Sequence, residues 1–244
     1  MVTRQRWQYA QKYEKLYWRE VAERLVTGSS GQLSWYAWKA GEMEKRLVAH
    51  LNEQKKKSAK ILEIGSGPIG IVSFLKWGKR YTIDPLEDFY KSNPALSKLR
   101  DPAVNYGQGT GEKLPFENNN FSLVILDNVL DHVNEASGVL REINRVLAND
   151  GLLYLAVNVH TKWGGFFHSI LSKLRIDKGH PYTFTVESIR SFVHAHQFNI
   201  QSKSINDYYQ AREQDIKSHS FKNKVKGYIG LSEFIYYAVC SKKI

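Results

Sequence analysis

ILEIGSGPIG, residues 61–70, joins a short apolar run to closely spaced glycines. The apolar run predicts a buried strand, and the glycines let the backbone turn tightly off that strand and come close to a ligand. Pro68 suits the first turn of a helix, which we expect to run to about Trp77. The amides that open such a helix favour electron-rich or anionic groups. This stretch therefore predicts a strand, a ligand-binding turn and a helix.

Strand and helix patterns continue to alternate after this stretch. Apolar runs that are typical of strands follow at residues 81–84, 103–107, 121–127, 152–159, 198–205 and 233–241. Helical patterns separate several of these runs, at residues 86–100, 135–147 and 185–196. This alternation predicts an α/β fold, in which a mostly parallel sheet carries helices on both faces. Together with the strand at 60–65, we expect seven strands.

The first part of the chain has a different pattern. Helices are expected at residues 4–26 and at about 33–54, on either side of the break TGSSG. Tyr9, Tyr13 and Tyr17 recur at helical spacing, which favours a stripe that packs against other helices. We therefore expect an N-terminal helical extension that forms part of a lid and substrate site (1–57), and a main domain (58–244) with inserts at about 160–180 and 207–230.

Positive charge is concentrated at both ends of the 244-residue chain, whose formal net charge is +11. Residues 1–60 contain 13 basic and 6 acidic side chains, and residues 160–244 contain the same numbers. The segment between them has a net charge of −3. Basic ends fit an anionic substrate, a nucleic acid or an anionic membrane surface, and they equally fit a solubilising surface.

Several classes of protein are excluded by composition. A hydrophobic content of 42% argues against a disordered chain, and no apolar run approaches the ~20 residues of a membrane span. The first ten residues, MVTRQRWQYA, lack the apolar segment of an export signal, so we expect a cytoplasmic protein. The single cysteine, Cys240, excludes an internal disulfide and a cysteine-rich zinc site, and we predict no metal site.

The glycine turn allows two interpretations. Gly65, Gly67 and Gly70 match G-x-G-x-x-G, which on its own suggests a dinucleotide fold. Glu63 stands where dinucleotide folds usually have an apolar residue, and its charge suits a cationic ligand such as a sulfonium or an amino-acid ammonium. Asp84 ends the next strand, where a carboxylate can accept hydrogen bonds from both hydroxyls of a ribose. The ligand is therefore expected to contain a nucleoside.

Downstream segments decide between these interpretations. In order they are GTGEKLPF (109–116), FSLVILDNVLDHV (121–133), REINRVLANDGLL (141–153) and GHPYTFT (179–185). Together with the glycine turn and Asp84, they resemble the motifs of class I S-adenosylmethionine (SAM) methyltransferases, in particular the type 11, ubiquinone-biosynthesis-like branch. The resemblance covers about residues 60–200 and implies a Rossmann-like sheet with SAM as the cofactor.

The resemblance also implies which residues hold the cofactor. They are Glu63, Gly65, Ser66, Gly67, Asp84, Gly111, Glu112, Asp127 and Asn128. Thr110 departs from the family pattern because it replaces the acid or amide that usually meets the adenine amine, a contact that Glu112 or backbone amides could supply. Ser122 stands where an aspartate often opens the fourth strand.

The methyl acceptor is less well defined by sequence. The chain has no N-P-P or D-P-P motif after the fourth strand and no cysteine placed for attack on a pyrimidine, which argues against base methylation. A hydroxyl acceptor gains from a general base, for which histidine is best suited. Family analogy favours His180, followed by His132 and His160. The expected substrate residues are Trp35, Tyr36, Trp163 and Tyr182.

We therefore expect a SAM-dependent methyltransferase that acts on a hydroxyl of a small-molecule or glycan-type acceptor, which could be anionic. An amine or a carbon is the less favoured acceptor atom. An RNA methyltransferase that uses the basic ends is the first alternative, and a non-catalytic nucleoside-binding module is the second. The oligomeric state is not predicted.

Overall fold

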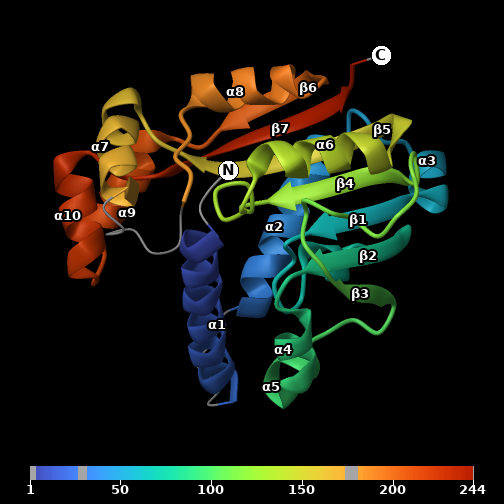
Figure 1. Ribbon diagram of the computed structural model, residues 1–244, viewed down its shortest axis with the longest axis horizontal. Helices are drawn as coiled ribbons and strands as arrows, with labels where there is room; N and C mark the ends of the chain where they lie inside the picture. Colours follow the sequence, from blue (N-terminus) through green and yellow to red (C-terminus); the bar gives the residue numbers. More distant parts are fainter. Residues whose placement is uncertain (1–3, 27–31, 174–180, 244) are drawn as a thin grey trace.

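The computed structural model of the protein describes residues 4–26, 32–173 and 181–243. A seven-stranded sheet runs through it in the order β3-β2-β1-β4-β5-β7-β6 (Figure 1). Its strands are β1 (Lys60–Ile64), β2 (Lys79–Asp84), β3 (Val104–Gln108), β4 (Phe121–Asp127), β5 (Leu147–Val159), β6 (Phe198–Ile205) and β7 (Phe234–Lys242). All neighbours are parallel except that β7 is antiparallel to β5 and β6. The predicted Rossmann-like, mostly parallel sheet is confirmed.

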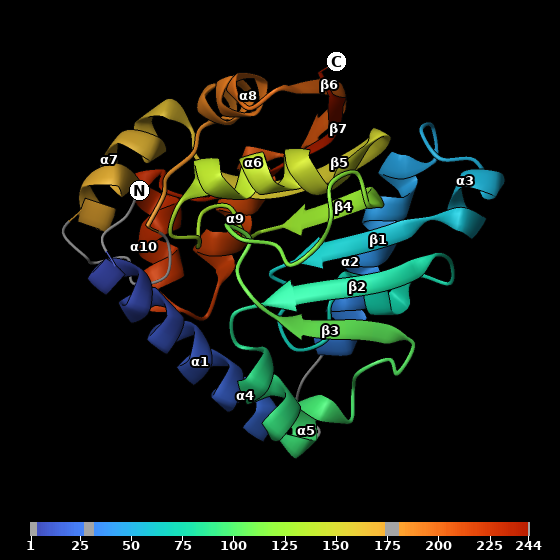
Figure 2. The ribbon, with the colours of Figure 1, turned by 45° about the vertical axis from the view of Figure 1, so that its right-hand side comes forward.

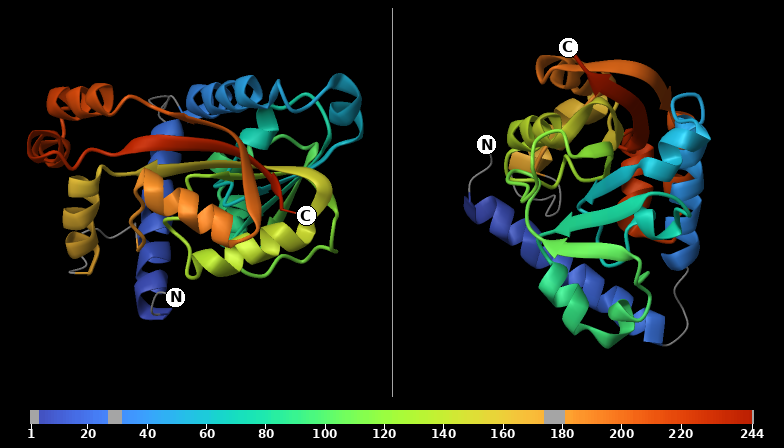
Figure 3. Two further views of the ribbon diagram at one scale, coloured as in Figure 1. Left: turned by 90° about the horizontal axis from the view of Figure 1, so that it is seen from above. Right: turned by 90° about the vertical axis from the view of Figure 1, so that its right-hand side faces the viewer.

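Helices cover both faces of the sheet (Figure 3). They are α1 (Arg4–Val26), α2 (Gln32–Leu47), α3 (Glu53–Ser58), η1 (Ile71–Phe74), α4 (Glu87–Ser92), α5 (Pro94–Ser97), α6 (Ala136–Val146), α7 (Lys162–Lys173), α8 (Val186–Ala195), α9 (Tyr208–Lys217) and α10 (Phe221–Ile229). Alternate side chains of a strand point to opposite faces, so Ile61 joins the core under α2 and Leu62 joins the core under α6. Two apolar cores therefore sandwich the sheet.

The helix predicted after Pro68 is wrong. Gly70 has a φ of +80°, which is outside the helical region, so no helix continues from Pro68 and only the short 3-10 helix η1 forms after it. The Glu63 carboxylate accepts from the first amides of η1, those of Ile71 and Val72. The chain then turns back early to begin β2.

Two other predicted helices are interrupted. The helix expected at 33–54 ends at Leu47, and α3 begins separately after Asn52, whose side chain accepts from the Lys55 amide. The helix expected at 86–100 divides before Pro94, because proline disfavours the helical conformation in the residue that precedes it. Asn93 caps the second piece, α5.

The tyrosine stripe of α1 does not pack as predicted. Tyr9 and Tyr13 are 44% and 45% exposed, whereas Trp18, Val21 and Ala22 on another side of the helix are buried. Trp18 packs edge-on against Tyr90 of α4, at a ring-centroid distance of 6.1 Å. Figure 2 shows α1 running past the carboxyl ends of the strands, beside α4 and α5. Its buried face therefore closes one end of the sheet.

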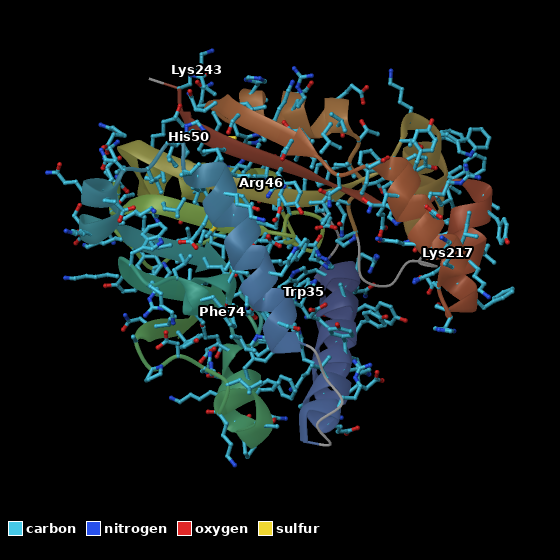
Figure 4. The ribbon with its side chains drawn as sticks, turned by 180° about the vertical axis from the view of Figure 1, so that it is seen from behind. Trp35, Arg46, His50, Phe74, Lys217 and Lys243 are labelled. Atoms are coloured by element: carbon cyan, nitrogen blue, oxygen red, sulfur yellow. The ribbon has the colours of Figure 1, made fainter. Side chains whose placement is uncertain are left out.

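Helix α2 starts beside α1 at that end of the sheet and runs toward β6 and β7 (Figure 4). Trp35 lies near its start, beside α1, and Arg46 lies near its end. The Arg46 guanidinium stacks on the Tyr237 ring of β7 and donates to Ser204 Oγ of β6. His50 Nε2 lies 2.9 Å from Ser202 Oγ of β6. These contacts hold α2 along the face of the sheet.

Within the two predicted inserts, the described residues form helices at the end where β5 stops. Helix α7 follows β5, while α9 and α10 come between β6 and β7 and lie next to it (Figure 1). In the described part of the chain, no helix combines the length and the hydropathy needed to cross a membrane.

Candidate functional site

A cavity of about 410 Å³ opens at the carboxyl ends of β1, β2 and β4. This is the edge at which open α/β sheets bind ligands, and the volume lies within the range of small-molecule sites. The turn after β1 forms its floor, and side chains of α1 and α2 form a wall across it. The site is therefore built partly by the sheet and partly by the N-terminal helices.

The glycine turn leaves no room for side chains. Gly65 and Gly67 have φ values of +67° and +61°, which residues with a Cβ atom rarely adopt. A Cβ at Gly65 would lie 2.6 Å from Val129, and one at Gly67 would lie 2.8 Å from Tyr36 Oη and 3.1 Å from Trp18. The two glycines therefore bring bare backbone to the floor of the cavity.

Asp84, the last residue of β2, supports this turn. Its Oδ2 accepts from the Gly67 amide at 2.9 Å and its Oδ1 accepts from the Leu86 amide at 2.8 Å. Burial raises the pKa of the carboxyl to about 7, although both amides favour the charged form. Each carboxylate oxygen can accept more than one hydrogen bond, so Asp84 retains capacity for a ligand.

Glu63 carries a second buried carboxyl beside the cavity. Its oxygens accept from the Ile71 and Val72 amides at 3.1 and 3.0 Å. Burial, with a smaller contribution from the nearby Asp127, raises the pKa of this carboxyl to about 8 against the opposing effect of the two amides. A cationic or hydrogen-bond-donating ligand would favour the charged forms of both buried carboxyls.

Lys39 is a site residue that the sequence reasoning missed. Its ammonium pairs with the Asp127 carboxylate at the end of β4, and their side chains are only 11% and 6% exposed. The same ammonium lies over the Trp35 ring, 4.1 Å from its centroid. Trp35 and Lys39 are one helical turn apart, and that spacing was the only available signal. The pair places a cation from α2 among the acids of the cavity.

The loop after β3 supplies the remaining wall. Glu112 Oε1 accepts from the amides of Asn134 and Glu135 at 2.9 and 3.1 Å, just before α6. A Cβ at Gly111 would press on Ile64 at 3.0 Å. Thr110, Gly111 and Glu112 all border the cavity. One oxygen of Glu112 is therefore used to anchor the loop.

The structure gathers most of the predicted site residues around this cavity. All nine predicted cofactor residues line it, as do Trp35, Tyr36 and His132. Trp163, Tyr182 and His160 do not line it, and His180 lies outside the described residues. The Tyr36 hydroxyl is fully buried, which raises its pKa well above the usual value, and it donates to the Ser66 carbonyl at 3.4 Å.

Several wall residues on α1 were also missed by sequence. Trp7, Gln11, Glu14 and Trp18 border the cavity. Trp18 donates from its indole to Glu14 Oε1 at 2.9 Å, which fixes both side chains on the inner face of the helix. Their spacing indicates a helix, but nothing in it indicates which element that helix covers.

Comparisons with known proteins agree with the methyltransferase motifs. Residues 62–155 match the family model of a methyltransferase domain. An uncharacterized methyltransferase of Schizosaccharomyces pombe is 28% identical over an alignment of 127 positions, which covers 48% of this chain and 45% of that protein. The match thus spans less than half the length of this curated relative.

Solved structures share the fold. The YcgJ protein of Bacillus subtilis is 18% identical, with a TM-score of 0.58 over 83% of this chain and 98% of that one. Geranyl diphosphate C-methyltransferase from Streptomyces coelicolor A3(2), solved with Mg²⁺, geranyl diphosphate and S-adenosyl-L-homocysteine, is 11% identical. Its TM-score is 0.61, over 84% of this chain and 79% of that one. Residues 62–155 therefore match a methyltransferase domain, as the motifs predicted, and the solved methyltransferase structures share the fold of this chain.

Proposed function

We propose that this chain transfers a methyl group from SAM to a hydroxyl of a small-molecule or glycan-type acceptor. One observation carries the proposal: all nine predicted cofactor residues border the same cavity. A bare glycine turn and a carboxylate at the end of the second strand suit the backbone and the ribose of a nucleoside. The two buried carboxyls with raised pKa values suit a ligand that brings positive charge.

Each part of the cofactor would meet a different group of this site. Asp84 would accept the ribose hydroxyls, and the loop at 110–112 would border the adenine. Asp127 and Glu63 would face the cationic methionine end, and Lys39 would meet its carboxylate. When bound, SAM supplies a methyl group on a sulfonium that is already a good leaving group, so the protein mainly has to orient the acceptor and exclude water.

His132 is the best-placed general base in the described part of the chain. It borders the cavity, and its Nε2 lies 3.8 Å from Oδ1 of the buried Asp131. A neighbouring carboxylate stabilises the imidazolium that forms when histidine takes a proton from a hydroxyl. His160 lies outside the cavity, and His180 stays a prediction.

The acceptor would bind next to the N-terminal helices. Trp35 and Tyr36 contribute aromatic surface to the cavity, and we propose that the extension 1–57 forms part of the acceptor site. Trp163 and Tyr182 stay predictions as acceptor residues, because they lie outside this cavity. A cytoplasmic location also stays a prediction.

The test is methyl transfer from tritiated SAM to three acceptor pools: hydroxylated small molecules, oligosaccharides and structured RNA. We expect label in one of the first two pools. In His132→Gln, kcat/KM should fall by roughly 10²- to 10⁴-fold while SAM affinity is retained. His194→Gln, which changes an exposed histidine of α8, is the matched control.

Three outcomes would contradict parts of the proposal. Label in RNA would replace the acceptor class with the nucleic-acid alternative. An unchanged rate in His132→Gln would remove the base. Absence of label in all three pools and in a cell lysate, with SAM bound, would favour a non-catalytic binding module.

A further inference from the structure

A second cluster of reactive side chains lies away from the cavity. His160 follows β5, His168 lies in α7 and Glu233 precedes β7. One nitrogen or oxygen from each lies within 4.8 Å of the others. Both histidines are buried, with 4% and 6% exposure, and none of the three residues borders the cavity. The methyltransferase motifs therefore leave this cluster without a role.

The spacing of the cluster fits ligands that share one ion. His160 Nε2 lies 3.6 Å from Glu233 Oε1. Two ligands at ~2.0–2.1 Å from a tetrahedral Zn²⁺ ion would lie about 3.3 Å apart. The rings of His160 and His168 stack at a centroid distance of 4.3 Å.

Neighbouring side chains hold the cluster in orientation. His168 Nδ1 lies 2.8 Å from Thr183 Oγ1. With Nδ1 as the donor, the lone pair of Nε2 is directed away from Thr183, which is the arrangement that metal-bound histidines usually show. Lys226 donates to Glu233 Oε2 at 3.1 Å, which leaves Oε1 on the side of His160. Thr183 thus holds His168 in orientation, and Lys226 holds Glu233.

We propose that His160, His168 and Glu233 bind one divalent transition-metal ion, with Zn²⁺ as the best fit. Two imidazoles and one carboxylate are a donor set that zinc accepts, and a water can complete the tetrahedron. Mg²⁺ and Ca²⁺ prefer oxygen ligands and fit poorly. The ion would tie the end of β5 to α7 and to the start of β7, so its role is to hold the insert helices on the sheet.

An ion-free network is the competing explanation. Lys226, Glu233 and His160 lie close enough for a chain of ion pairs and hydrogen bonds without any metal. Such a network would stabilise the same elements but would show no saturable binding of Zn²⁺. The two explanations therefore differ in what the purified protein binds.

The experiment uses the full chain without a polyhistidine tag, stripped by a chelator and dialysed against Zn²⁺ alone. Bound metal is measured by plasma mass spectrometry, and unfolding is followed by circular dichroism. We expect one Zn²⁺ per chain and, at about 100 times the Kd, a midpoint raised by roughly 5–10 °C. Mg²⁺ at the same concentration should not raise it. The measurement does not depend on methyl transfer.

Two variants test the assignment. Glu233→Gln keeps the size of the side chain and an oxygen for Lys226, and His168→Asn removes one imidazole. Each should weaken Zn²⁺ binding by more than the roughly 10- to 100-fold that loss of a supporting partner costs. His194→Gln, on the exposed side of α8, should bind as the parent does. No saturable Zn²⁺ binding by the parent, or equal binding by a folded Glu233→Gln, would overturn the proposal.

Discussion

The cofactor-side cavity and the His160–His168–Glu233 cluster are assembled in different ways. At the cavity, the carboxyls of Glu63 and Asp84 are held mainly by backbone amides of nearby turns. At the cluster, side chains from the end of β5, from α7 and from before β7 meet one another directly. Glu63 and Asp84 fall within the segment that matches a methyltransferase domain, whereas all three cluster residues lie beyond it. Local turns thus position the two cavity carboxyls, whereas contacts between distant elements position the cluster.

The largest expected effect tests the first region at Asp84. If Asp84 accepts the ribose hydroxyls as proposed, Asp84→Ala removes a charged acceptor, so SAM affinity should fall by about 1.5–3 kcal/mol, or roughly 10- to 150-fold, in a calorimetric titration. Asp84→Asn, which keeps one oxygen for the Leu86 amide, should lose less. Asp150→Ala changes an exposed aspartate and serves as the control. Unchanged affinity in a folded Asp84→Ala protein would remove the ribose assignment.

A second variant tests whether the fold of the glycine turn depends on a residue without a side chain. Gly67→Ala places a Cβ against Tyr36 Oη at a positive φ, so the free energy of unfolding should fall by about 1–3 kcal/mol. Gly41→Ala, in α2, meets nothing within 4 Å and should be neutral or stabilising by up to about 1 kcal/mol. Both are measured by denaturant unfolding. Equal stability of the two variants would mean that the turn tolerates a side chain.

The same contrast explains what sequence could predict. Gly65, Gly67 and Asp84 were found because glycine spacing and a strand-ending acid are local patterns, and the alternation of strands and helices specified the sheet. Asn93 and Pro94 already indicate a break in the helix expected at 86–100, but the prediction did not use this signal. The fold of η1 depends on Glu63, which reaches it from the neighbouring strand.

Other site residues could not be predicted from sequence, because only the folded structure brings them together. The charge on Lys39 is ordinary in a helix, and only the packing of α2 brings it to Asp127. The partly exposed tyrosines of α1 follow the same spacing as packed residues, so periodicity alone did not show that Tyr13 and Tyr17 border the cavity and do not pack against another helix. His168 and Glu233 were not considered as site residues, because they are far apart in the chain and match no metal-binding motif.

Substitution of Lys39 tests whether the N-terminal helices contribute to the proposed cofactor site. Lys39→Met should weaken SAM binding about tenfold, the low end of the range for hydrogen bonds to charged groups, because the methionine carboxylate loses its cation. Lys45→Met, on the exposed side of the same helix, should leave affinity unchanged. Calorimetric titration of both variants measures the difference. Equal or tighter binding by Lys39→Met would confine the cofactor contacts to the sheet.

The smallest expected effect is a pH dependence. The pKa values of Asp84 and Glu63 are raised to about 7 and about 8, so the ligand-free site holds protons near neutrality. A ligand that donates hydrogen bonds or brings positive charge favours the ionised forms, so SAM affinity should rise about threefold to tenfold from pH 6 to pH 8. Binding should release protons, which titrations in buffers of different ionisation enthalpy detect. Affinity that falls over this range would contradict the charge assignment.

The ligand-free protein should show the opposite trend in stability. Because both pKa values lie above those of the unfolded chain, the contribution of these carboxyls to stability is complete below about pH 4. It is lost as the pH rises through 7 to 8. The midpoint of thermal unfolding, followed from pH 4 to 8 without ligand and with saturating SAM, separates this loss from the gain on binding.

Thermal unfolding with SAM, S-adenosylhomocysteine or NAD tests the central claim that this cavity is a SAM site. At about 100 times its Kd, a ligand adds about 2.7 kcal/mol, which should raise the midpoint by roughly 5–10 °C. We predict such a shift with SAM and with S-adenosylhomocysteine, and none with NAD. A shift with NAD alone would mean that the glycine turn serves a dinucleotide, and the methyltransferase account would fail.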